Sequence, residues 1–229
     1  METAFGRALI SSLDNNRLQS FTIQKEGAPP IQENCSNYFV ASPDHMKALE
    51  QIAIPASAAV LDYGCGLGRH LKYLRSLHPD IYCYGIDQCE LMRDHCCEAI
   101  DSPYEFVPSL KDLTQEKFDL ILLMGNGLGI LGDKESALQG LKDLTERLNK
   151  GGQLLIETGN PFGKGYTLGK FTISFEEHRD DFHWGYADKD WIEAALTNLG
   201  FDLEFFEVQA FQGHFFLVNA KLPPPGGSD

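Results

Sequence analysis

The sequence feature that most constrains the fold is an alternation of short apolar runs with helical periodicity between Ala58 and Lys221. Five apolar runs predict strands, at 59–63, 82–86, 104–107, 118–124 and 153–157. Leucine stripes and helical spacing predict helices between them, at about 69–77, 90–99 and 133–148. Nearly continuous apolar strands that alternate with helices indicate a parallel sheet with helices on both faces. We therefore expect a doubly wound α/β fold.

The last part of this region departs from the alternation. Segments 201–208 and 214–221 predict two strands joined by only five residues, 209–213. That gap is too short for a parallel crossover, so the two strands should be antiparallel neighbours. Segments 171–175 and 182–186 predict an earlier antiparallel excursion, followed by a helix at about 190–199. The expected sheet has seven strands, mostly parallel, with an antiparallel terminal hairpin.

The two ends of the chain differ from the domain at 55–222. Residues 1–54 are too few for an independent core and predict an extension that lies over the domain. Within the extension we expect a helix at 4–13, a strand at 20–24 and a helix at 43–52. Residues 223–229 are rich in Pro and Gly and predict a flexible tail.

Charge narrows the range of partners. The chain has 19 Lys and Arg against 33 Asp and Glu, for a net charge of −14, and no basic cluster. Binding to nucleic acid requires many basic contacts, and an anionic membrane repels an acidic protein. We therefore expect no nucleic-acid partner and no membrane partner. No apolar run approaches the roughly 18 residues of a membrane span.

The cysteine pattern points to a reducing compartment. The six cysteines are Cys35, Cys65, Cys83, Cys89, Cys96 and Cys97. None form a C-x-x-C pair, and the start of the chain lacks the basic and apolar regions of a secretion signal. We expect reduced thiols in a cytoplasmic protein. We expect no metal, because no His or Cys ligand spacing typical of a metal site is present.

The sharpest chemical signal is the segment VLDYGCGLGRH at 60–70. Asp62 ends a predicted strand, and Gly64, Gly66 and Gly68 then form a turn in which no Cβ obstructs a ligand. A dinucleotide loop prefers G-x-G-x-x-G, and a triphosphate loop needs Gly-Lys-Ser/Thr. The acid before the glycines favours a cationic or amino-bearing ligand over a pyrophosphate. The alternative is a glycine-rich turn that binds no ligand.

This segment resembles the first motif of the class I S-adenosylmethionine-dependent methyltransferases, and the resemblance covers about 58–221. It implies a Rossmann-like fold with S-adenosylmethionine as cofactor, its methionine end cradled by the glycine loop. Asp87, in YGID, is similar to the family's acid that accepts both ribose hydroxyls, since its two oxygens can each accept one O–H. The alternative for Asp87 is a helix N-cap.

The resemblance implies further cofactor contacts. These are Tyr38, Cys65, Arg69, Gln88, Met92 or its neighbour Leu91, Ser109, Leu110, Met124 and Gly125. Tyr38 would fold over the methionine moiety, or else pack within the extension. Arg69 would neutralise the cofactor carboxylate, or else carry an ordinary surface charge. Ser109 stands where many members have an acid that binds the adenine amine, so Ser109 or the Leu110 backbone would replace that contact.

The catalytic expectations rest on two regions. The fourth predicted strand ends in MGNG, without the [Asp/Asn]-Pro-Pro-[Tyr/Phe] signature of certain amino-methylating members, and we expect Asn126 to face the substrate. The alternative is a turn-forming Asn with an unusual φ. An insertion at about 159–187 is where relatives often build the substrate pocket. Within it, His183 is the preferred candidate for a general base, which is needed only if the nucleophile carries a proton.

The resulting functional hypothesis is methyl transfer to an O or N atom of a small molecule. One alternative is a module that binds S-adenosylmethionine and senses it without methyl transfer. Another is an aminopropyl transferase of the same fold, which would usually show more acids around the glycine loop. The sequence is compatible with a monomer or a homodimer.

Overall fold

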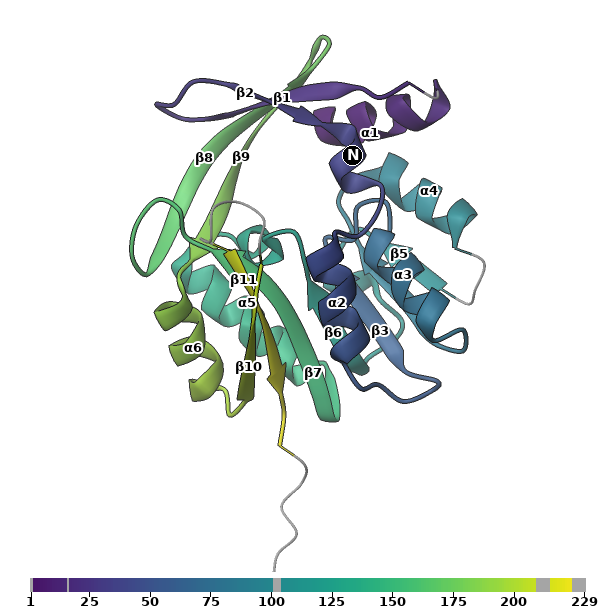
Figure 1. Ribbon diagram of the computed structural model, residues 1–229, viewed down its shortest axis with the longest axis vertical. Helices are drawn as coiled ribbons and strands as arrows, with labels where there is room; N and C mark the ends of the chain where they lie inside the picture. Colours follow the sequence, from purple (N-terminus) through teal and green to yellow (C-terminus); the bar gives the residue numbers. More distant parts are fainter. Residues whose placement is uncertain (1, 16, 101–103, 209–214, 224–229) are drawn as a thin grey trace, which may run out of the picture.

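The computed structural model of the protein describes residues 2–15, 17–100, 104–208 and 215–223. At its centre is a seven-stranded sheet in the order β10-β11-β7-β6-β3-β4-β5 (Figure 1). Its strands are β3 (Ala59–Tyr63), β4 (Tyr82–Ile86), β5 (Tyr104–Val107), β6 (Phe118–Leu123), β7 (Leu148–Gly159), β10 (Asp202–Glu207) and β11 (Phe215–Lys221). Strands β3 to β7 are parallel, whereas β11 runs antiparallel to both β7 and β10. The predicted α/β fold with an antiparallel terminal hairpin is confirmed.

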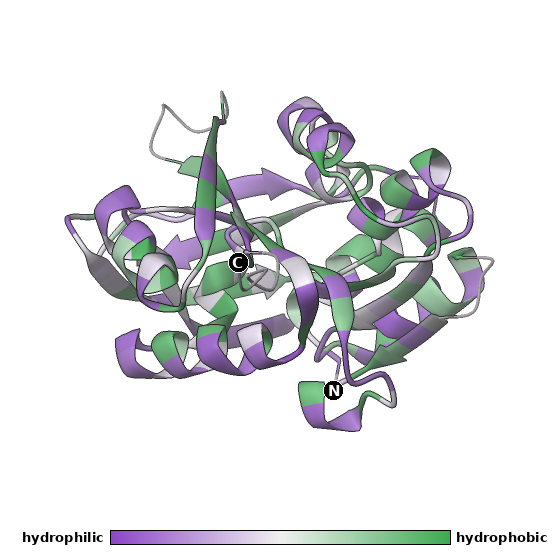
Figure 2. Ribbon diagram, turned by 90° about the horizontal axis from the view of Figure 1, so that it is seen from below, coloured by the Kyte–Doolittle hydropathy of each residue, from purple (hydrophilic) through white to green (hydrophobic). Residues whose placement is uncertain are grey.

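Helices cover both faces of this sheet because successive strand residues point to opposite sides. On one face, α2 (Pro43–Gln51), α3 (Arg69–Leu77) and α4 (Glu90–Ala99) pack against residues such as Val60 and Leu122. On the other, α5 (Lys134–Glu146) and α6 (Lys189–Asn198) pack against residues such as Leu61 and Ile121. Figure 2 shows the corresponding alternation of hydrophilic and hydrophobic residues along the helices. The helices expected in the domain are therefore present, on the expected two faces.

One boundary differs from the prediction. The residues expected to end a helix, 149–152, belong to the first part of β7. The β6–β7 register jumps from the Phe118–Leu148 pair to the Leu120–Gln153 pair, so these residues form a bulge. Gly151 has a φ of 74°, which a residue with a side chain rarely adopts. The glycines that suggested a helix end therefore mark an irregular strand.

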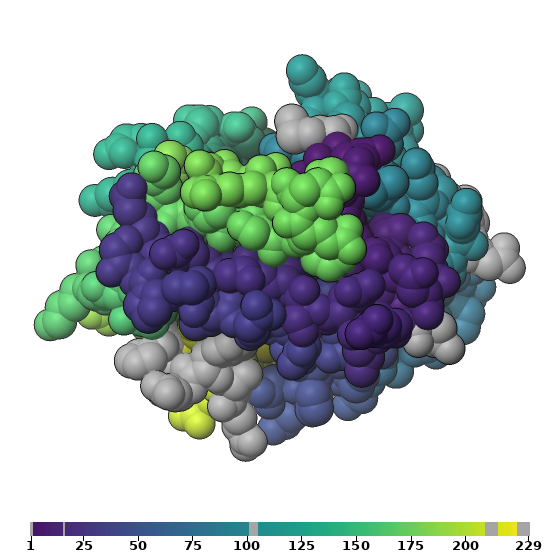
Figure 3. Space-filling model, turned by 90° about the horizontal axis from the view of Figure 1, so that it is seen from above, coloured from purple at the N-terminus to yellow at the C-terminus, as the bar shows by residue number. Residues whose placement is uncertain are grey.

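A second sheet, antiparallel and four-stranded, lies outside the parallel core. It joins two strands of the N-terminal extension to a hairpin that follows β7. Its order is β2-β1-β8-β9. The strands are β1 (Ser20–Lys25), β2 (Ile31–Asn34), β8 (Tyr166–Phe175) and β9 (His178–Ala187). The antiparallel excursion and the strand near residue 20 were expected, whereas β2 and the pairing of β1 with β8 were not. Figure 3 shows the two segments side by side on the surface.

The extension also shares a separate apolar cluster with the glycine loop. Helix α1 (Ala4–Asp14) contributes Leu9, which packs in one cluster with Leu67, Met92 and Phe175. Leu67 belongs to the glycine loop and Met92 to α4, so the extension is packed directly against both. The domain boundaries at 54/55 and 222/223 stay predictions. The tail residues 224–229 lie outside the described part of the chain.

Candidate functional site

The glycine loop lies between β3 and α3, at the carboxyl edge of the sheet. Gly64, Gly66 and Gly68 have φ values of 83°, 53° and 71°, in the left-handed region that favours glycine. A Cβ on Gly64 would lie 2.2 Å from Ile130 Cδ1, whereas the nearest atom to a Cβ on Gly66 is Met92 Sδ, at 3.9 Å. Packing therefore requires glycine at 64, while a Cβ at position 66 would make only an ordinary van der Waals contact with Met92.

Asp87 lies directly beside this loop, as predicted. Its Oδ2 accepts a hydrogen bond from the Gly66 N–H at 3.0 Å, and its Oδ1 accepts one from the Cys89 N–H at 2.8 Å. Burial raises the pKa of the Asp87 carboxyl, although these two N–H groups lower it. Cys89, rather than Asp87, is the N-cap residue of α4. Each carboxylate oxygen accepts one protein hydrogen bond and can accept another from a ligand hydroxyl.

Asp62, at the end of β3, has an unsatisfied oxygen. Its side chain is 1% exposed, its Oδ2 lies 3.4 Å from His70 Nδ1, and its Oδ1 has no hydrogen-bond partner. A buried polar atom without a partner costs about 1–3 kcal/mol, and more when it is charged. The site therefore fits a ligand that brings an N–H group to this oxygen.

The loop after β6 forms the adjacent wall. Gly125 and Asn126 have φ values of 66° and 56°. Glu157, on β7, accepts hydrogen bonds through Oε2 from the Gly125 N–H at 2.5 Å and the Asn126 N–H at 3.3 Å. Glu157 was not predicted from the sequence, yet an acid at the end of a buried apolar run is the same signal that identified Asp62 and Asp87. Glu157 therefore fixes the backbone of this loop.

Asn126 has the unusual φ of a turn-forming residue, and it also has a side-chain atom that is free to contact a substrate. It adopts the left-handed conformation, and its side chain is buried. Its Nδ2 donates to the Gly185 carbonyl at 3.2 Å, and its Oδ1 is buried without a partner. Because the carbonyl needs a donor, this contact fixes which amide atom is which. The Asn126 Oδ1 is therefore a free acceptor.

Arg69 connects the extension to this wall. One of its terminal N–H groups donates to the Asn37 carbonyl at 2.5 Å, and its guanidinium lies 5.6 Å from the centre of the Tyr38 ring. A Cβ on Gly125 would lie 3.5 Å from Arg69 Nη2. Burial lowers the pKa of Arg69, while Glu157 and Asp62 raise it. Arg69 is therefore a half-buried cation at the site, with Tyr38 beside it.

The other predicted cofactor residues lie along the same edge. Met92 and Met124 are buried, Gln88 is exposed, and Leu110 is half-buried. The Ser109 hydroxyl donates to Asp112 rather than being free. The Cys65 thiol is buried, and its pKa is raised, chiefly by Cys96 and then by burial. Any contact of Cys65 with a ligand would therefore come from its backbone.

The structure does not bring His183 together with Asn126. His183 is exposed on β9 and pairs with Lys170, whereas its neighbour Trp184 points to the opposite face of the strand. The Trp184 indole N–H donates to the Asn126 carbonyl at 3.0 Å. A base role for His183 stays a prediction that this position does not favour.

Comparison with known proteins identifies the domain. Residues 60–152 match a family model described as a methyltransferase domain. The computed fold is similar to a methyltransferase from Bacteroides fragilis in complex with S-adenosyl-L-homocysteine, with a TM-score of 0.80, 18% identity and 96% and 95% of the two chains covered. Residues 60–152 are therefore similar to a methyltransferase domain, and the chain has the fold of S-adenosylmethionine-dependent methyltransferases.

Two further similarities concern other proteins. The CcbJ methyltransferase from Streptomyces caelestis has a TM-score of 0.64 and 17% identity, with 97% and 99% of the two chains covered. A tRNA U34 carboxymethyltransferase from Colwellia psychrerythraea is 34% identical in an alignment of 115 residues that covers 48% of this chain. The aligned part spans only 34% of the length of that curated relative.

S-adenosylmethionine, the methyl donor of this methyltransferase family, fits the residues at the site. The unsatisfied Asp62 Oδ1 suits its amino group, and the Asp87 carboxylate suits its ribose diol. Gly66 has no side chain of its own to keep a ligand from the backbone, and Arg69 would be the cation for the cofactor carboxylate. Within the described ranges, no cluster of three or more His, Cys, Asp or Glu side chains could hold a metal.

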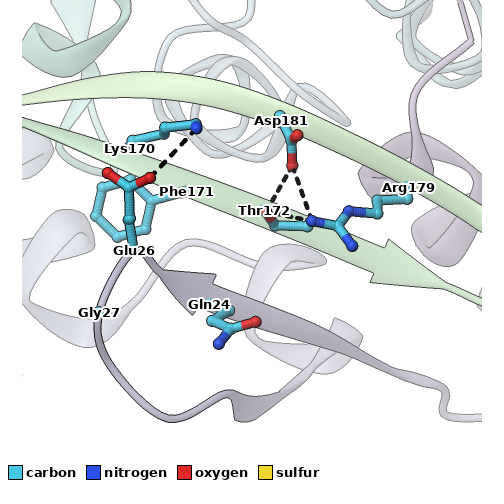
Figure 4. Close-up of a pocket in the computed structure, with 8 residues that line it drawn as sticks. All are labelled: Gln24, Glu26, Gly27, Lys170, Phe171, Thr172, Arg179 and Asp181. Atoms are coloured by element: carbon cyan, nitrogen blue, oxygen red, sulfur yellow. Dashed lines mark hydrogen bonds and ion pairs between the residues drawn. The ribbon is translucent and has the colours of Figure 1, made fainter.

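A separate cavity of about 220 Å³ lies on the small sheet, between β1, β8 and β9 (Figure 4). Its charged side chains are exposed and already paired, with Lys170 next to Glu26 at 3.3 Å and Arg179 next to Asp181 at 3.5 Å. It therefore offers no unpaired charge to a ligand.

In the part of the chain that the structure describes, no helix is long and apolar enough to cross a membrane.

Proposed function

We propose that this protein transfers a methyl group from S-adenosylmethionine to an oxygen or nitrogen atom of a small molecule. One observation carries the proposal. The glycine loop, with Asp62 and Asp87 beside it, and the Gly125–Asn126 loop lie together at one edge of the sheet. The cofactor supplies an activated methyl group on its sulfonium. The protein then has to bind, to orient the acceptor and to exclude water.

The surroundings of Asn126 support a small acceptor that carries an O–H or N–H group. The free Asn126 Oδ1 can accept a hydrogen bond from such a group. Above it, the β8–β9 hairpin and the segment before it contribute an aromatic face, formed by Phe162, Phe171, Phe182, Trp184 and Tyr186. Aromatic faces favour apolar, flat or cationic ligands. Burial raises the pKa of Tyr186 to about 12, so Tyr186 is a hydrogen-bond donor rather than a base.

The cofactor part of the proposal is tested by calorimetric titration with S-adenosylmethionine. In Asp87→Ala the two hydroxyl contacts are lost, and hydrogen bonds to a charged group contribute about 1.5–3 kcal/mol each. We expect affinity to fall at least about a hundredfold. Asp94→Ala, at an exposed position on α4, is the matched control and should bind like the wild type. Equal binding by Asp87→Ala would refute the assignment.

The acceptor part is tested with cofactor labelled in its methyl group. The protein and the labelled cofactor are incubated with the small-molecule fraction of a cell extract. In a separate incubation they are combined with total tRNA. We expect label in the small-molecule fraction. Transfer to tRNA would instead favour the acceptor class named for the Colwellia relative. Cofactor binding without any transfer would favour the sensing alternative.

A further inference from the structure

A chain of four buried polar side chains runs behind the site. Asp62 on β3 contacts His70 on α3, with Oδ2 and Nδ1 3.4 Å apart. His70 Nε2 lies 3.2 Å from Nδ1 of His45 on α2. His45 Nε2 lies 3.0 Å from Oε2 of Glu157 on β7. All four side chains are less than a tenth exposed, so water does not replace these contacts.

The chain of four requires one more proton than two neutral histidines supply. Its three contacts need three hydrogens, and the carboxylates of Asp62 and Glu157 only accept. Two neutral imidazoles carry one N–H each, which leaves one contact without a hydrogen. One imidazolium satisfies all three contacts and gives the four groups a net charge of −1. The geometry is therefore complete only when one extra proton is held between His45 and His70.

With His70 as the neutral ring, the three contacts require hydrogens on both ring nitrogens of His45. Burial lowers the pKa of His70 more than Asp62 raises it, so His70 is the neutral partner. His45 then donates to both Glu157 and His70, and His70 donates to Asp62. Arg69, which acts on Glu157, Asp62 and His70, is the nearby cation, and Asp87 is a further anion that interacts with Asp62.

Both ends of this chain of four reach the cofactor site. Glu157 holds the N–H groups of Gly125 and Asn126, and Asp62 borders the glycine loop. His45 lies outside the matched methyltransferase region, in the first turn of α2, where its own N–H donates to the capping Ser42 hydroxyl at 3.2 Å. The cap fixes the position of His45 relative to the sheet.

We infer that His45 is a positioning residue that, by holding one proton, bridges Glu157 and His70 and keeps the Gly125–Asn126 loop and Asp62 aligned for the cofactor. This role rests on the proposed function, because the aligned groups are those assigned to cofactor binding. His45 acts through its two partners, Glu157 and His70.

Two variants separate the two contacts of His45. His45→Gln places an N–H₂ near the original Nε2 and can still reach Glu157, whereas His45→Asn places its amide near the original Nδ1 and can still reach His70. Neither side chain can hold the extra proton. We expect each variant to weaken S-adenosylmethionine binding about tenfold by calorimetry. His78→Gln, at the end of α3, is the matched control and should bind like the wild type.

The shared proton is tested independently by ¹⁵N NMR of the imidazole rings in the full chain without cofactor. We expect one ring with hydrogens on both nitrogens, because the three contacts require three hydrogens. That signal should be absent from His45→Gln and present in His78→Gln. Two neutral rings in the wild type, or unchanged cofactor affinity in both His45 variants, would overturn the inference.

The two proposals fail in different ways. If wild-type protein does not bind S-adenosylmethionine, the proposed function is refuted, and the positioning role with it. If the wild type binds the cofactor and the NMR spectra show only neutral imidazoles, the proposed function stands and the role of His45 is refuted.

Discussion

Buried titratable side chains link the stability of this protein to pH. His70 is the clearest case, because burial lowers its pKa below the ordinary value of 6.5. The pKa of His95 is also lowered, by burial and by Lys72. For both groups the unfolded chain takes up a proton at a higher pH than the folded chain. Their contribution to stability is therefore fully present above about pH 6.5 and is lost as the pH falls below that value.

The first prediction concerns His70 and acid pH. We expect the free energy of unfolding to fall between about pH 7 and about pH 5.5, by at most about 1.4 kcal/mol per pH unit for each proton taken up. His70→Asn, which can still donate to Asp62, should show a shallower dependence. Urea denaturation at several pH values measures both. A wild-type stability that rises over this range would contradict the prediction.

Among the elements, η3 (Gly127–Leu131) packs closely against β9, beside the loop that carries Asn126. A Cβ on Gly129 would lie 2.1 Å from Trp184 Cδ1 and Nε1. The Trp184 N–H already donates to the Asn126 carbonyl, and the Tyr166 hydroxyl donates to the Gly132 carbonyl at 2.5 Å. The base of the β8–β9 hairpin is therefore held against the loop that carries Asn126.

A prediction at this contact is that Gly129→Ala displaces the Trp184 ring. Overpacking of this kind costs typically about 1–3 kcal/mol, and the displaced ring should also lower the rate of methyl transfer. Gly163→Ala is a suitable control, since its nearest atom is Thr167 Oγ1 at 3.8 Å. Urea denaturation and Trp fluorescence measure the effect. Wild-type stability in Gly129→Ala would show that the ring can move without cost.

Helix α1 provides a second prediction at the scale of elements. Leu9 is 1% exposed and packs in the cluster that contains Leu67 of the glycine loop. Leu9→Ala should lower the free energy of unfolding by about 2–5 kcal/mol. Leu13→Ala, on the same helix but 36% exposed, should have a much smaller effect. Equal losses in the two variants would argue against docking of α1 on the domain.

At the scale of the whole molecule, charge makes a prediction about nucleic acid. The net charge of −14 should prevent tight binding to tRNA at physiological ionic strength, because affinity for phosphates depends on basic contacts. A mobility-shift titration with total tRNA should show no complex at micromolar protein. Binding that weakens steeply with added salt would reveal a basic surface and favour a tRNA acceptor.

Much of the parallel core could be predicted from the sequence, because its signals are local. A strand buried on both faces needs a continuous apolar run, as in Phe118–Leu123. The left-handed turn after β3 needs glycines, and these are visible without knowledge of the partners. The acids Asp62 and Asp87 follow from the same pattern, since each ends such a run.

The sequence by itself thus determined the α/β class, the glycine loop and the carboxylates beside it. Only the tertiary structure decided that β1 pairs with β8, that His183 lies on the exposed face of β9, and that His45 reaches Glu157. Residues 45 and 157 are far apart in the chain, and no local pattern records which partner a buried histidine meets. Strand register and side-chain pairing depend on the packing of whole elements, which is why they appear only in the folded molecule.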